Sequence, residues 1–374
     1  MMKALGIILA GGNSKRMREL SNLRAPSAMP IIGSYRAIDF TLSNMSNSGI
    51  GRVGVFTQFN SVSLNEHLNS SKWWDFGRKQ GGLFVFAPTI TTARSDWYRG
   101  TADSIYQNLN FLYRSHEPYV IITSGDCVYK ADFNKMLDYH IKTGADITMA
   151  TKDMPEDTDI TRYGVVTVDD ENRVLEIEEK PLDSPIRKVS CGIYVIRRRL
   201  LIELIEKGGT EERYDFVNDI LIKYRKSKKI VSYDLPGYWS NISSVEDYYR
   251  TNMDFLNPEV SKYFLVESPA IYSKVDDYPA TKYNPGSDVK NALVSSGCII
   301  NGHVENSLLF KNVYIGNGAK IINSILLNDV YIGDNVIIEN CIVESRSTLE
   351  AGKNYISEPG DIKIVAEING RYTI

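Results

Sequence analysis

The C-terminal quarter of the chain repeats itself with a period of 17 residues. The tetrapeptides NSLL, NSIL and NCIV begin at Asn306, Asn323 and Asn340, and the VYIG of residues 313–316 returns at residues 330–333. Apolar residues recur at short intervals, with glycine and asparagine between them and few helix-forming residues. This pattern is typical of a β-solenoid, in which each coil stacks its inward side chains on those of the next coil. We therefore predict a β-helix domain over residues 288–374.

The first 250 residues have another pattern, in which strand-like apolar runs alternate with amphipathic helical segments. KALGIIL, GRVGVFTQF and YVIITSGD are strand-like, whereas ADSIYQNLNFLYRSH and DFNKMLDYHIKTG have helical periodicity. Such alternation predicts an α/β domain over residues 1–250, with a doubly wound, mostly parallel sheet and helices on both faces. The 374 residues also exceed the size, about 250–300 residues, at which single cores divide. Residues 251–287 are predicted to be an irregular connector, because they contain Pro258, Pro269, Pro279 and Pro285.

Composition and charge exclude several classes of partner and site. The formal net charge is −3 and lysine and arginine form no basic run, so neither nucleic acid nor an anionic membrane surface is an expected partner. No apolar run approaches the roughly 18 residues of a membrane span, and the apolar start of the chain suits a buried strand better than a signal peptide. The cysteines lack the spacing of a zinc site or a disulfide framework, which predicts a cytoplasmic protein; they are Cys127, Cys191, Cys298 and Cys341.

A glycine pair follows the first predicted strand, in the sequence LAGGNSKRM of residues 9–17. Backbone N–H groups that glycines expose after a strand can hold phosphate, and a nearby arginine can balance its charge. Gly11, Gly12 and Arg16 are therefore candidates for a loop that binds nucleotide phosphates. A plain strand-to-helix turn is the alternative, and the glycine pair alone does not decide between them.

Three further stretches place charged groups where a site would need them. Asp126 follows the apolar run YVIITSG, where a carboxylate can hold Mg²⁺ together with substrate phosphates, although aspartate is also a common turn and capping residue. Glu179 and Lys180, in EEKP, suit sugar hydroxyls and a sugar phosphate, or simply an exposed strand end. Asp103, in WYRGTADS, reads by itself as the start of an amphipathic helix.

Taken together, these stretches resemble the glucose-1-phosphate adenylyltransferase family, also called ADP-glucose pyrophosphorylases, of bacterial glycogen and plant starch synthesis. The resemblance runs nearly end to end, through AGG, YRAIDFTLSN, WYRGTADS, SGDCVYK, EEKP, CGIYV, RYDF and the C-terminal repeats. It implies a nucleotidyltransferase-like domain followed by a left-handed parallel β-helix that packs subunits together. It also implies that the α-phosphate of ATP is joined to glucose 1-phosphate with release of pyrophosphate, a charge-neutralising reaction that uses Mg²⁺.

The resemblance also implies site residues, position by position. The remaining catalytic positions are Arg16 and Asp126, of which Asp126 is the expected metal ligand. The sugar-phosphate side comprises Glu179, Lys180, Ser190, Tyr194, Asp215, Phe216 and Trp239. The nucleotide side comprises Gly11, Gly12, Gln58, Tyr98, Gly100 and Asp103.

Several catalytic positions depart from the family pattern. GGxGxRL becomes GGNSKRM, RxKPA becomes RAPSA and WRDVGT becomes WSNISS, so that Ser14 replaces a glycine, Pro26 a lysine and Asn241 the second metal carboxylate. Val217 and Asn218 likewise replace a glycine-lysine pair. An amide anchors Mg²⁺ poorly, and losing one charge-stabilising contact typically costs about 10²–10³ in rate. We therefore expect Mg²⁺ binding to be weak or absent and the glycine loop to be a remnant.

A kept sugar site with altered phosphate chemistry resembles the GlgD-type subunits that some Gram-positive bacteria pair with a catalytic paralogue. This resemblance implies a regulatory, non-catalytic or weakly catalytic subunit of an allosteric hetero-oligomer, expected to be a heterotetramer, while a homo-oligomer can form in isolation. Glucose 1-phosphate, ATP or anionic effectors are the expected ligands. One alternative is an active adenylyltransferase in which Lys15 or Arg24 compensates for the losses. Another is an acyltransferase built on the solenoid, whose only histidine is His303.

Overall fold

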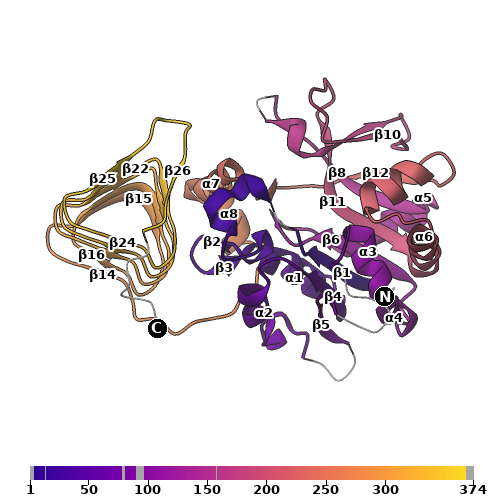
Figure 1. Cartoon of the computed structure of the whole chain (residues 1–374), viewed down its shortest axis with the longest axis horizontal. Coiled ribbons are helices and arrows are strands. Elements are labelled where there is room, and N and C mark those ends of the chain that lie inside the picture. Colours follow the sequence, from indigo (N-terminus) through magenta and orange to yellow (C-terminus); the bar gives the residue numbers. More distant parts are fainter. Residues whose placement is uncertain (1–3, 13, 78–80, 90–96, 157, 368–374) are drawn as a thin grey trace.

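The computed structural model describes residues 4–12, 14–77, 81–89, 97–156 and 158–367. An α/β domain fills one side of the molecule and a triangular stack of parallel strands fills the other (Figure 1). Helices α7 (Val245–Met253) and α8 (Pro258–Leu265) lie between the two domains. None of the helices in the described part of the chain combines the length and hydrophobicity that crossing a membrane requires.

The α/β domain is built on one nine-stranded sheet, which is mixed. Its parallel half has the order β5-β4-β1-β6, and β11 joins β6 in the antiparallel direction. The prediction of a doubly wound α/β sheet is confirmed, with an antiparallel extension through β11. The strands are β1 (Ala4–Ala10), β4 (Arg52–Thr57), β5 (Gly82–Phe86), β6 (Tyr119–Ser124), β8 (Ile147–Asp153), β9 (Gly164–Val168), β10 (Val174–Glu179), β11 (Lys188–Arg197) and β12 (Ile230–Asp234).

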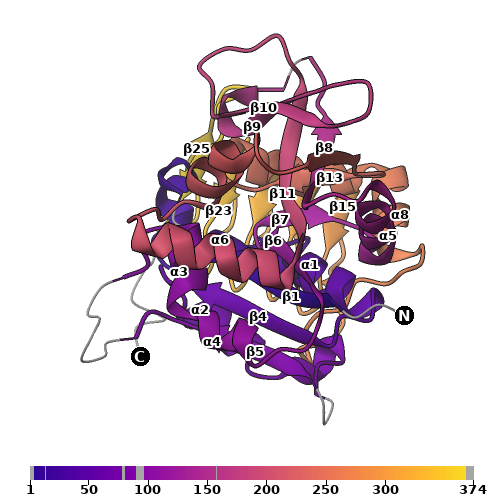
Figure 2. The ribbon, with the colours of Figure 1, turned by 90° about the vertical axis from the view of Figure 1, so that its right-hand side faces the viewer.

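Helices cover both faces of this sheet because successive side chains of each strand point to opposite faces. Ile8 of β1 packs in one hydrophobic cluster with α1, α2 and α5, whereas Ile7 packs in a second cluster with α3, α4 and α6. Figure 2 shows α6 and α3 in front of the strands. The helices are α1 (Ala37–Asn47), α2 (Val62–Leu68), α3 (Thr101–Gln107), α4 (Leu109–Tyr113), α5 (Phe133–Thr143) and α6 (Arg198–Thr210).

Short elements connect the sheet to the site. Single turns of 3-10 helix span Lys15–Ser21, Pro26–Ala28, Ser71–Trp74, Ile160–Arg162 and Asp254–Leu256, and a π-helical segment spans Phe216–Ile222. Two small antiparallel pairs are β2 (Pro30–Ile31) with β3 (Tyr35–Arg36), and β7 (Cys127–Tyr129) with β13 (Trp239–Asn241). The β7–β13 pair brings the SGDC stretch beside the WSN stretch.

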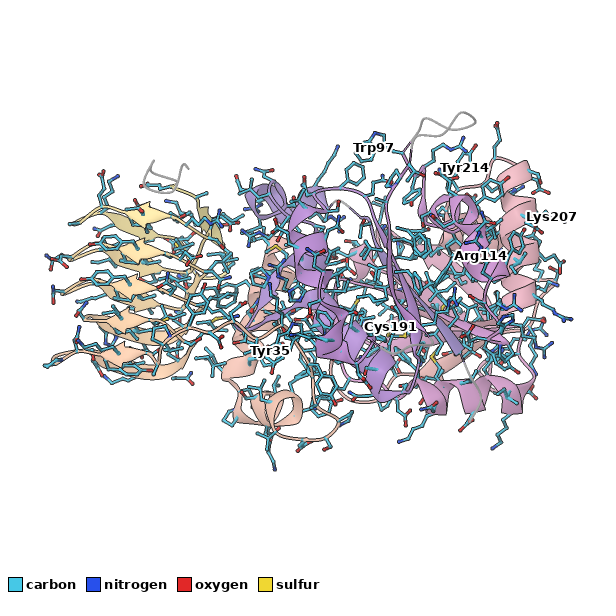
Figure 3. The ribbon with its side chains drawn as sticks, turned by 90° about the horizontal axis from the view of Figure 1, so that it is seen from below. Tyr35, Trp97, Arg114, Cys191, Lys207 and Tyr214 are labelled. Carbon is cyan, nitrogen blue, oxygen red and sulfur yellow. The ribbon has the colours of Figure 1, made fainter. Side chains whose placement is uncertain are left out.

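The C-terminal domain is the predicted parallel β-helix. Strands that are 17 residues apart pair in register, as Ile315 does with Ile332 and Ile321 with Ile338, and these side chains are fully buried. Figure 3 shows the coils stacked as a ladder beside the α/β domain. The strands are β14 (Lys282–Tyr283), β15 (Asp288–Val294), β16 (Ile299–Ile300), β17 (His303–Leu309), β18 (Tyr314–Ile315), β19 (Lys320–Ile322), β20 (Ile325–Leu326), β21 (Tyr331–Ile332), β22 (Ile337–Glu339), β23 (Cys341–Val343), β24 (Thr348–Leu349), β25 (Asn354–Ile356) and β26 (Lys363–Val365).

The asparagine of each repeat turns a corner of the coil. Asn306, Asn323 and Asn340 have φ values of 45°, 45° and 54°. Among residues other than glycine, asparagine tolerates this left-handed conformation best. The repeat therefore keeps asparagine at the position where the chain passes from one face of the β-helix to the next.

The connector is more ordered than predicted. Residues 251–287 begin with the end of α7 and contain the whole of α8. The side chain of Asn257 accepts a hydrogen bond from the Glu259 N–H at 2.9 Å, and Pro258 occupies the first turn, where its missing N–H costs nothing. The prediction of an irregular segment was therefore wrong at Pro258, which begins a helix instead of interrupting one.

A third hydrophobic cluster joins the two domains. Phe40, Tyr248 and Phe264 from the first domain and its connector pack with Leu308 and Phe310 of the β-helix. The Tyr249 hydroxyl of α7 also donates to the Asn323 carbonyl at 2.7 Å. Helix α7 is therefore in direct contact with a coil of the β-helix.

The buried His140 of α5 predicts how stability depends on pH. Its Nδ1 lies 2.8 Å from the Thr148 hydroxyl, and burial lowers its pKa from 6.5 to about 4. The unfolded chain then binds more protons than the folded chain between these two values. We expect stability to fall as the pH drops through this window, by about 2 kcal/mol between pH 7 and pH 5.

Urea unfolding of the native chain and of His140→Asn at pH 7 and pH 5 tests this expectation. The variant should lose most of this pH-dependent difference. His116→Asn is the matched control, because His116 is exposed. Equal pH dependence of the native chain and of His140→Asn would contradict the assignment.

Candidate functional site

A cavity of about 760 Å³ opens at the carboxyl ends of the parallel strands. In the register of the sheet, Leu9 of β1 lies opposite Phe56 of β4 and Ser124 of β6, and all three residues line the cavity. The loops that follow these strands therefore meet at one edge, which is where ligands bind in open α/β sheets. Five cationic side chains and two carboxyl side chains line it, namely Lys15, Arg16, Arg99, Arg162, Lys180, Asp126 and Glu179.

The glycine loop forms one wall of this cavity. Gly11, Gly12 and Ser14 line it, and a Cβ atom on Gly11 would lie only 3.2 Å from the Cβ of Gln58. The Ser14 hydroxyl donates a hydrogen bond to the carbonyl of Ser243 across the cavity. The serine that stands in this loop is therefore tied to the segment that leads into α7.

Lys15 and Arg16 follow this loop and are exposed at the cavity. Within the described part of the chain neither forms an ion pair. Both cations are therefore placed to meet an anion in the cavity.

Arg24 points away from the cavity. Its Nη2 lies 2.7 Å from Oε1 of Glu344 in the β-helix, and both side chains are largely buried, at 14% and 4% exposed. Pro26 and Ser27, by contrast, line the cavity. Of the two residues predicted as possible compensating cations, only Lys15 reaches the cavity, because the guanidinium of Arg24 is held by Glu344.

Asp126 and Asn241 face one another across the β7–β13 pair. The Asn241 Nδ2 lies 3.2 Å from Oδ1 of Asp126, and the Ser124 hydroxyl donates to the same oxygen. Asn241 Nδ2 is also 3.3 Å from the Cys127 sulfur. Removal from bulk water raises the pKa of the Asp126 carboxyl, and these hydrogen bonds oppose that rise. Asp126 thus takes part in a hydrogen-bonded cluster with its own neighbours.

The predicted sugar-phosphate residues gather at the other end of the cavity. Glu179, Lys180, Ser190, Tyr194, Phe216 and Trp239 all line it. Lys180 lies 3.1 Å from Glu179, and the Ser190 and Tyr194 hydroxyls are 3.3 Å apart. Trp239 is 6% exposed, and its Nε1 has no acceptor among the described residues.

Asp215 does not line the cavity. Its side chain accepts a hydrogen bond from the Asn218 N–H at 2.7 Å, which places it at the start of the π-helical segment. The neighbouring Phe216 packs instead against Tyr194, with ring centroids 5.3 Å apart.

The predicted nucleotide residues form the opposite wall. The amide of Gln58 pairs with the backbone of Tyr98, accepting from its N–H at 2.9 Å and donating to its carbonyl at 3.2 Å. Gly100 is required by close packing, since a Cβ there would lie 2.3 Å from the Tyr214 carbonyl oxygen. Asp103 is buried behind this wall and accepts from the Arg99 N–H at 2.8 Å. Asp103 therefore orders the loop from behind.

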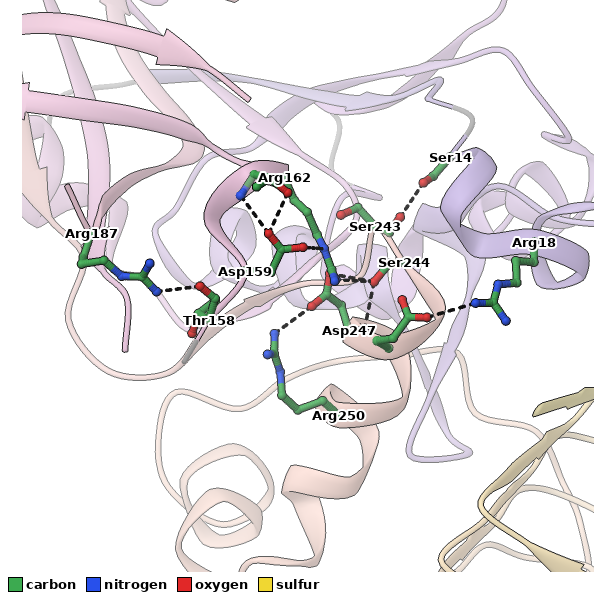
Figure 4. Close-up of polar contacts among 12 residues, drawn as sticks. Ser14, Arg18, Thr158, Asp159, Arg162, Arg187, Ser243, Ser244, Asp247 and Arg250 are labelled. Atoms are coloured by element: carbon green, nitrogen blue, oxygen red, sulfur yellow. Dashed lines mark hydrogen bonds and ion pairs between the residues drawn. The ribbon is translucent and has the colours of Figure 1, made fainter. Parts of the chain in front are cut away.

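The structure adds Arg162 to the cavity wall, which sequence reasoning missed. Its guanidinium donates to Ser244 and Asp247, at 2.6 Å each, and to Asp159 at 2.8 Å (Figure 4). Ser244 is the cap of α7, so Arg162 fastens the lobe of β9 and β10 to the start of that helix. The only signal in the sequence is the position of Arg162 just before the strand-like YGVVTV.

Comparison with known proteins identifies the family. The nucleotidyl transferase family model matches residues 5–257, and the GlmU-like, C-terminal hexapeptide model matches residues 280–356. Glucose-1-phosphate adenylyltransferases of Bacillus mycoides (strain KBAB4) and Bacillus cereus (strain ATCC 10987 / NRS 248) are each 36% identical to this chain over 370 residues, covering 98% of both chains. The same enzyme of Bacillus anthracis matches equally.

The chain belongs to the glucose-1-phosphate adenylyltransferase family. The predicted resemblance to ADP-glucose pyrophosphorylases is thereby confirmed, and the hexapeptide match agrees with a left-handed β-helix.

Nucleotidyltransferases generally use Mg²⁺, so the donor groups of this glucose-1-phosphate adenylyltransferase homologue were compared with the preferences of that ion. Mg²⁺ takes oxygen ligands, usually from one or two carboxylates. Here one carboxyl, Asp126, is present, and three donors surround its Oδ1. No group of three histidine, cysteine, aspartate or glutamate side chains suited to a metal ion occurs among the described residues. These groups do not match the ligand set of a magnesium site.

The Arg24–Glu344 pair predicts a strong effect on stability. In Glu344→Ala the Arg24 guanidinium would stay largely buried without its partner, so we expect a loss of about 3 kcal/mol in the free energy of unfolding. Urea unfolding followed by tryptophan fluorescence measures this loss. Glu350→Ala, at an exposed position of the same domain, should change stability little. Equal stability of the two variants would contradict the inferred role of the pair.

Proposed function

We propose that this chain is a regulatory, weakly catalytic or non-catalytic subunit of glucose-1-phosphate adenylyltransferase. The observation that carries the proposal is the pairing of Asp126 with the amide of Asn241, 3.2 Å away, where a second carboxylate is expected in the family. An amide N–H satisfies a carboxylate without a metal ion, whereas two adjacent carboxylates repel one another unless a cation lies between them. The chain would therefore bind Mg²⁺ weakly or not at all at Asp126.

Changes in the glycine loop support the same proposal. Ser14 places a side chain where a bare backbone would let phosphate approach, and its hydroxyl is already bonded to Ser243. Pro26 supplies no charge to the cavity wall. Each lost contact of this kind costs about 10²–10³ in rate, although such losses are strongly non-additive.

The alternative is that the chain is itself an active adenylyltransferase. Lys15 and Arg16 favour this alternative, because both are exposed at the cavity without an ion-pair partner in the described part of the chain. In that case Lys15 would supply the positive charge that Pro26 lacks. Asp126→Asn should then abolish ADP-glucose synthesis by the isolated chain.

The partner that fits a regulatory subunit is a catalytic paralogue with the same two domains. β-Helices of this kind offer flat parallel sheets to neighbouring subunits, and a hetero-oligomer, expected to be a heterotetramer, would bring the paralogue beside this chain. In isolation a homo-oligomer can form through the same surfaces.

ADP-glucose synthesis tests the proposal directly. It is measured with Mg²⁺ for the chain alone, for a catalytic paralogue alone and for the mixture. We expect almost no product from the chain alone and an altered turnover or effector response in the mixture. Robust synthesis by the chain alone, or an unchanged paralogue, would overturn the proposal.

Restoring the second carboxylate should create metal affinity. In Asn241→Asp two carboxyl groups would face one another, and we expect Mn²⁺ affinity to rise about tenfold or more, measured by electron paramagnetic resonance of the free ion. Asn218→Asp, whose side chain lies outside the cavity lining, is the matched control. Tight Mn²⁺ binding by the native chain would contradict the assignment.

A further inference from the structure

The two halves of the cavity differ in how far their polar groups are satisfied. We call Glu179, Lys180, Ser190, Tyr194 and Trp239 the sugar half. At the opposite end Asp126, Ser124 and Asn241 satisfy one another by hydrogen bonds. The sugar half, in contrast, keeps polar groups that are available to a ligand.

The clearest of these groups is the indole N–H of Trp239. Trp239 lines the cavity and is 6% exposed, yet its Nε1 finds no acceptor among the described residues. Buried donors are rarely left without a partner, and each such group needs a separate explanation. A ligand oxygen in the cavity is the partner that would satisfy it.

The remaining groups of the sugar half define the chemistry of that ligand. The Ser190 and Tyr194 hydroxyls can each donate or accept, and Glu179 accepts. This set suits a molecule with several hydroxyl groups. Lys180, which is 60% exposed, and the unpaired Lys15 and Arg16 supply positive charge for a phosphate. The complementary ligand class is a hexose phosphate.

The sugar half is also connected to the β-helix. Trp239 and Asn241 lie on β13, the Ser243 carbonyl follows, and Ser244 caps α7. Arg162 binds both Ser244 and Asp247 at 2.6 Å (Figure 4).

At its other side α7 reaches both domains. The Tyr248 hydroxyl donates to the Pro30 carbonyl at 2.6 Å, and the Tyr249 hydroxyl donates to the Asn323 carbonyl of the β-helix at 2.7 Å. A short, rigid path of bonded segments thus runs from the indole of Trp239 to one coil of the β-helix.

We propose that the sugar half binds a hexose phosphate as an effector, without a divalent metal ion, and that helix α7 transmits its occupancy to the β-helix. This inference rests on the regulatory role proposed above and adds to it the site and the ligand class of the regulation. The group that would hold a nucleotide's metal is internally satisfied, so the hexose phosphate binds without ATP and is not consumed.

Calorimetric titration of the full chain with glucose 1-phosphate in EDTA tests the binding step. We expect binding in EDTA, unchanged by added Mg²⁺, and weaker binding of inorganic phosphate, which lacks the hydroxyl groups. Trp239→Phe keeps a ring but removes the N–H donor, so affinity should fall up to about tenfold. Trp73→Phe, outside the cavity lining, should leave it unchanged.

Glu179→Gln provides a second variant in case Trp239→Phe does not fold, with Glu178→Gln on the same strand as its control. Glu179→Gln should also weaken binding up to about tenfold. No binding in EDTA, a requirement for Mg²⁺, or full affinity in both cavity variants would each overturn the binding site.

Hydrogen exchange of the chain alone tests the path through α7. Glucose 1-phosphate in EDTA should slow amide exchange around Asn323, and Tyr249→Phe should remove this effect while binding persists. Exchange that is unchanged by ligand, or unaffected by Tyr249→Phe, would overturn the transmission step. Because these experiments contain neither ATP nor a partner, their failure leaves the regulatory role intact, whereas ADP-glucose synthesis by the chain alone would remove that role whatever they show.

Discussion

The parallel register of β1 with β4 and β6 is the constraint on which the site depends. All three strands are buried on both faces, so a slip of one residue would exchange the side chains of two hydrophobic clusters. The register sets Leu9 opposite Phe56 and Ser124, and the loops after these strands therefore meet at one edge. Substitutions in those loops, such as serine at position 14 or asparagine at position 241, alter the chemistry of the cavity without altering the sheet that supports it.

Sequence periodicity predicted the parts of the fold that depend on local pattern. The 17-residue repeat predicted the β-helix, because each coil buries the same positions. Strand and helix alternation predicted the α/β domain, but not the antiparallel direction of β11, which is set by the distant strands that it joins. Helix α8 was missed because Asn257-Pro258 suits both a chain break and a helix start, and only the packing of Phe264 in the domain interface selects the helix.

The site was predictable where its residues directly follow strands, as Gly11, Asp126 and Glu179 do. Contacts between distant segments could not be read from the sequence. The Arg162–Asp247 pair spans 85 residues and the Arg24–Glu344 pair spans 320, so neither side chain announces its partner locally. The resemblance placed Asp103 and Asp215 at the site, whereas the structure puts them behind it, holding backbone N–H groups of the cavity loops.

The Arg24–Glu344 pair also determines how the two domains are aligned. On the face of the β-helix that meets the α/β domain, Leu308, Ile325 and Ile342 form one column, 17 residues apart. In the neighbouring column Phe310 and Leu327 are followed at the same spacing by Glu344. Apolar columns alone would fit nearly as well after sliding by one coil, about 4.8 Å. Such a slide would set Leu327 against Arg24 and bury an unpaired guanidinium. The single carboxylate thus acts as an index mark that fixes the position of the β-helix along its own axis.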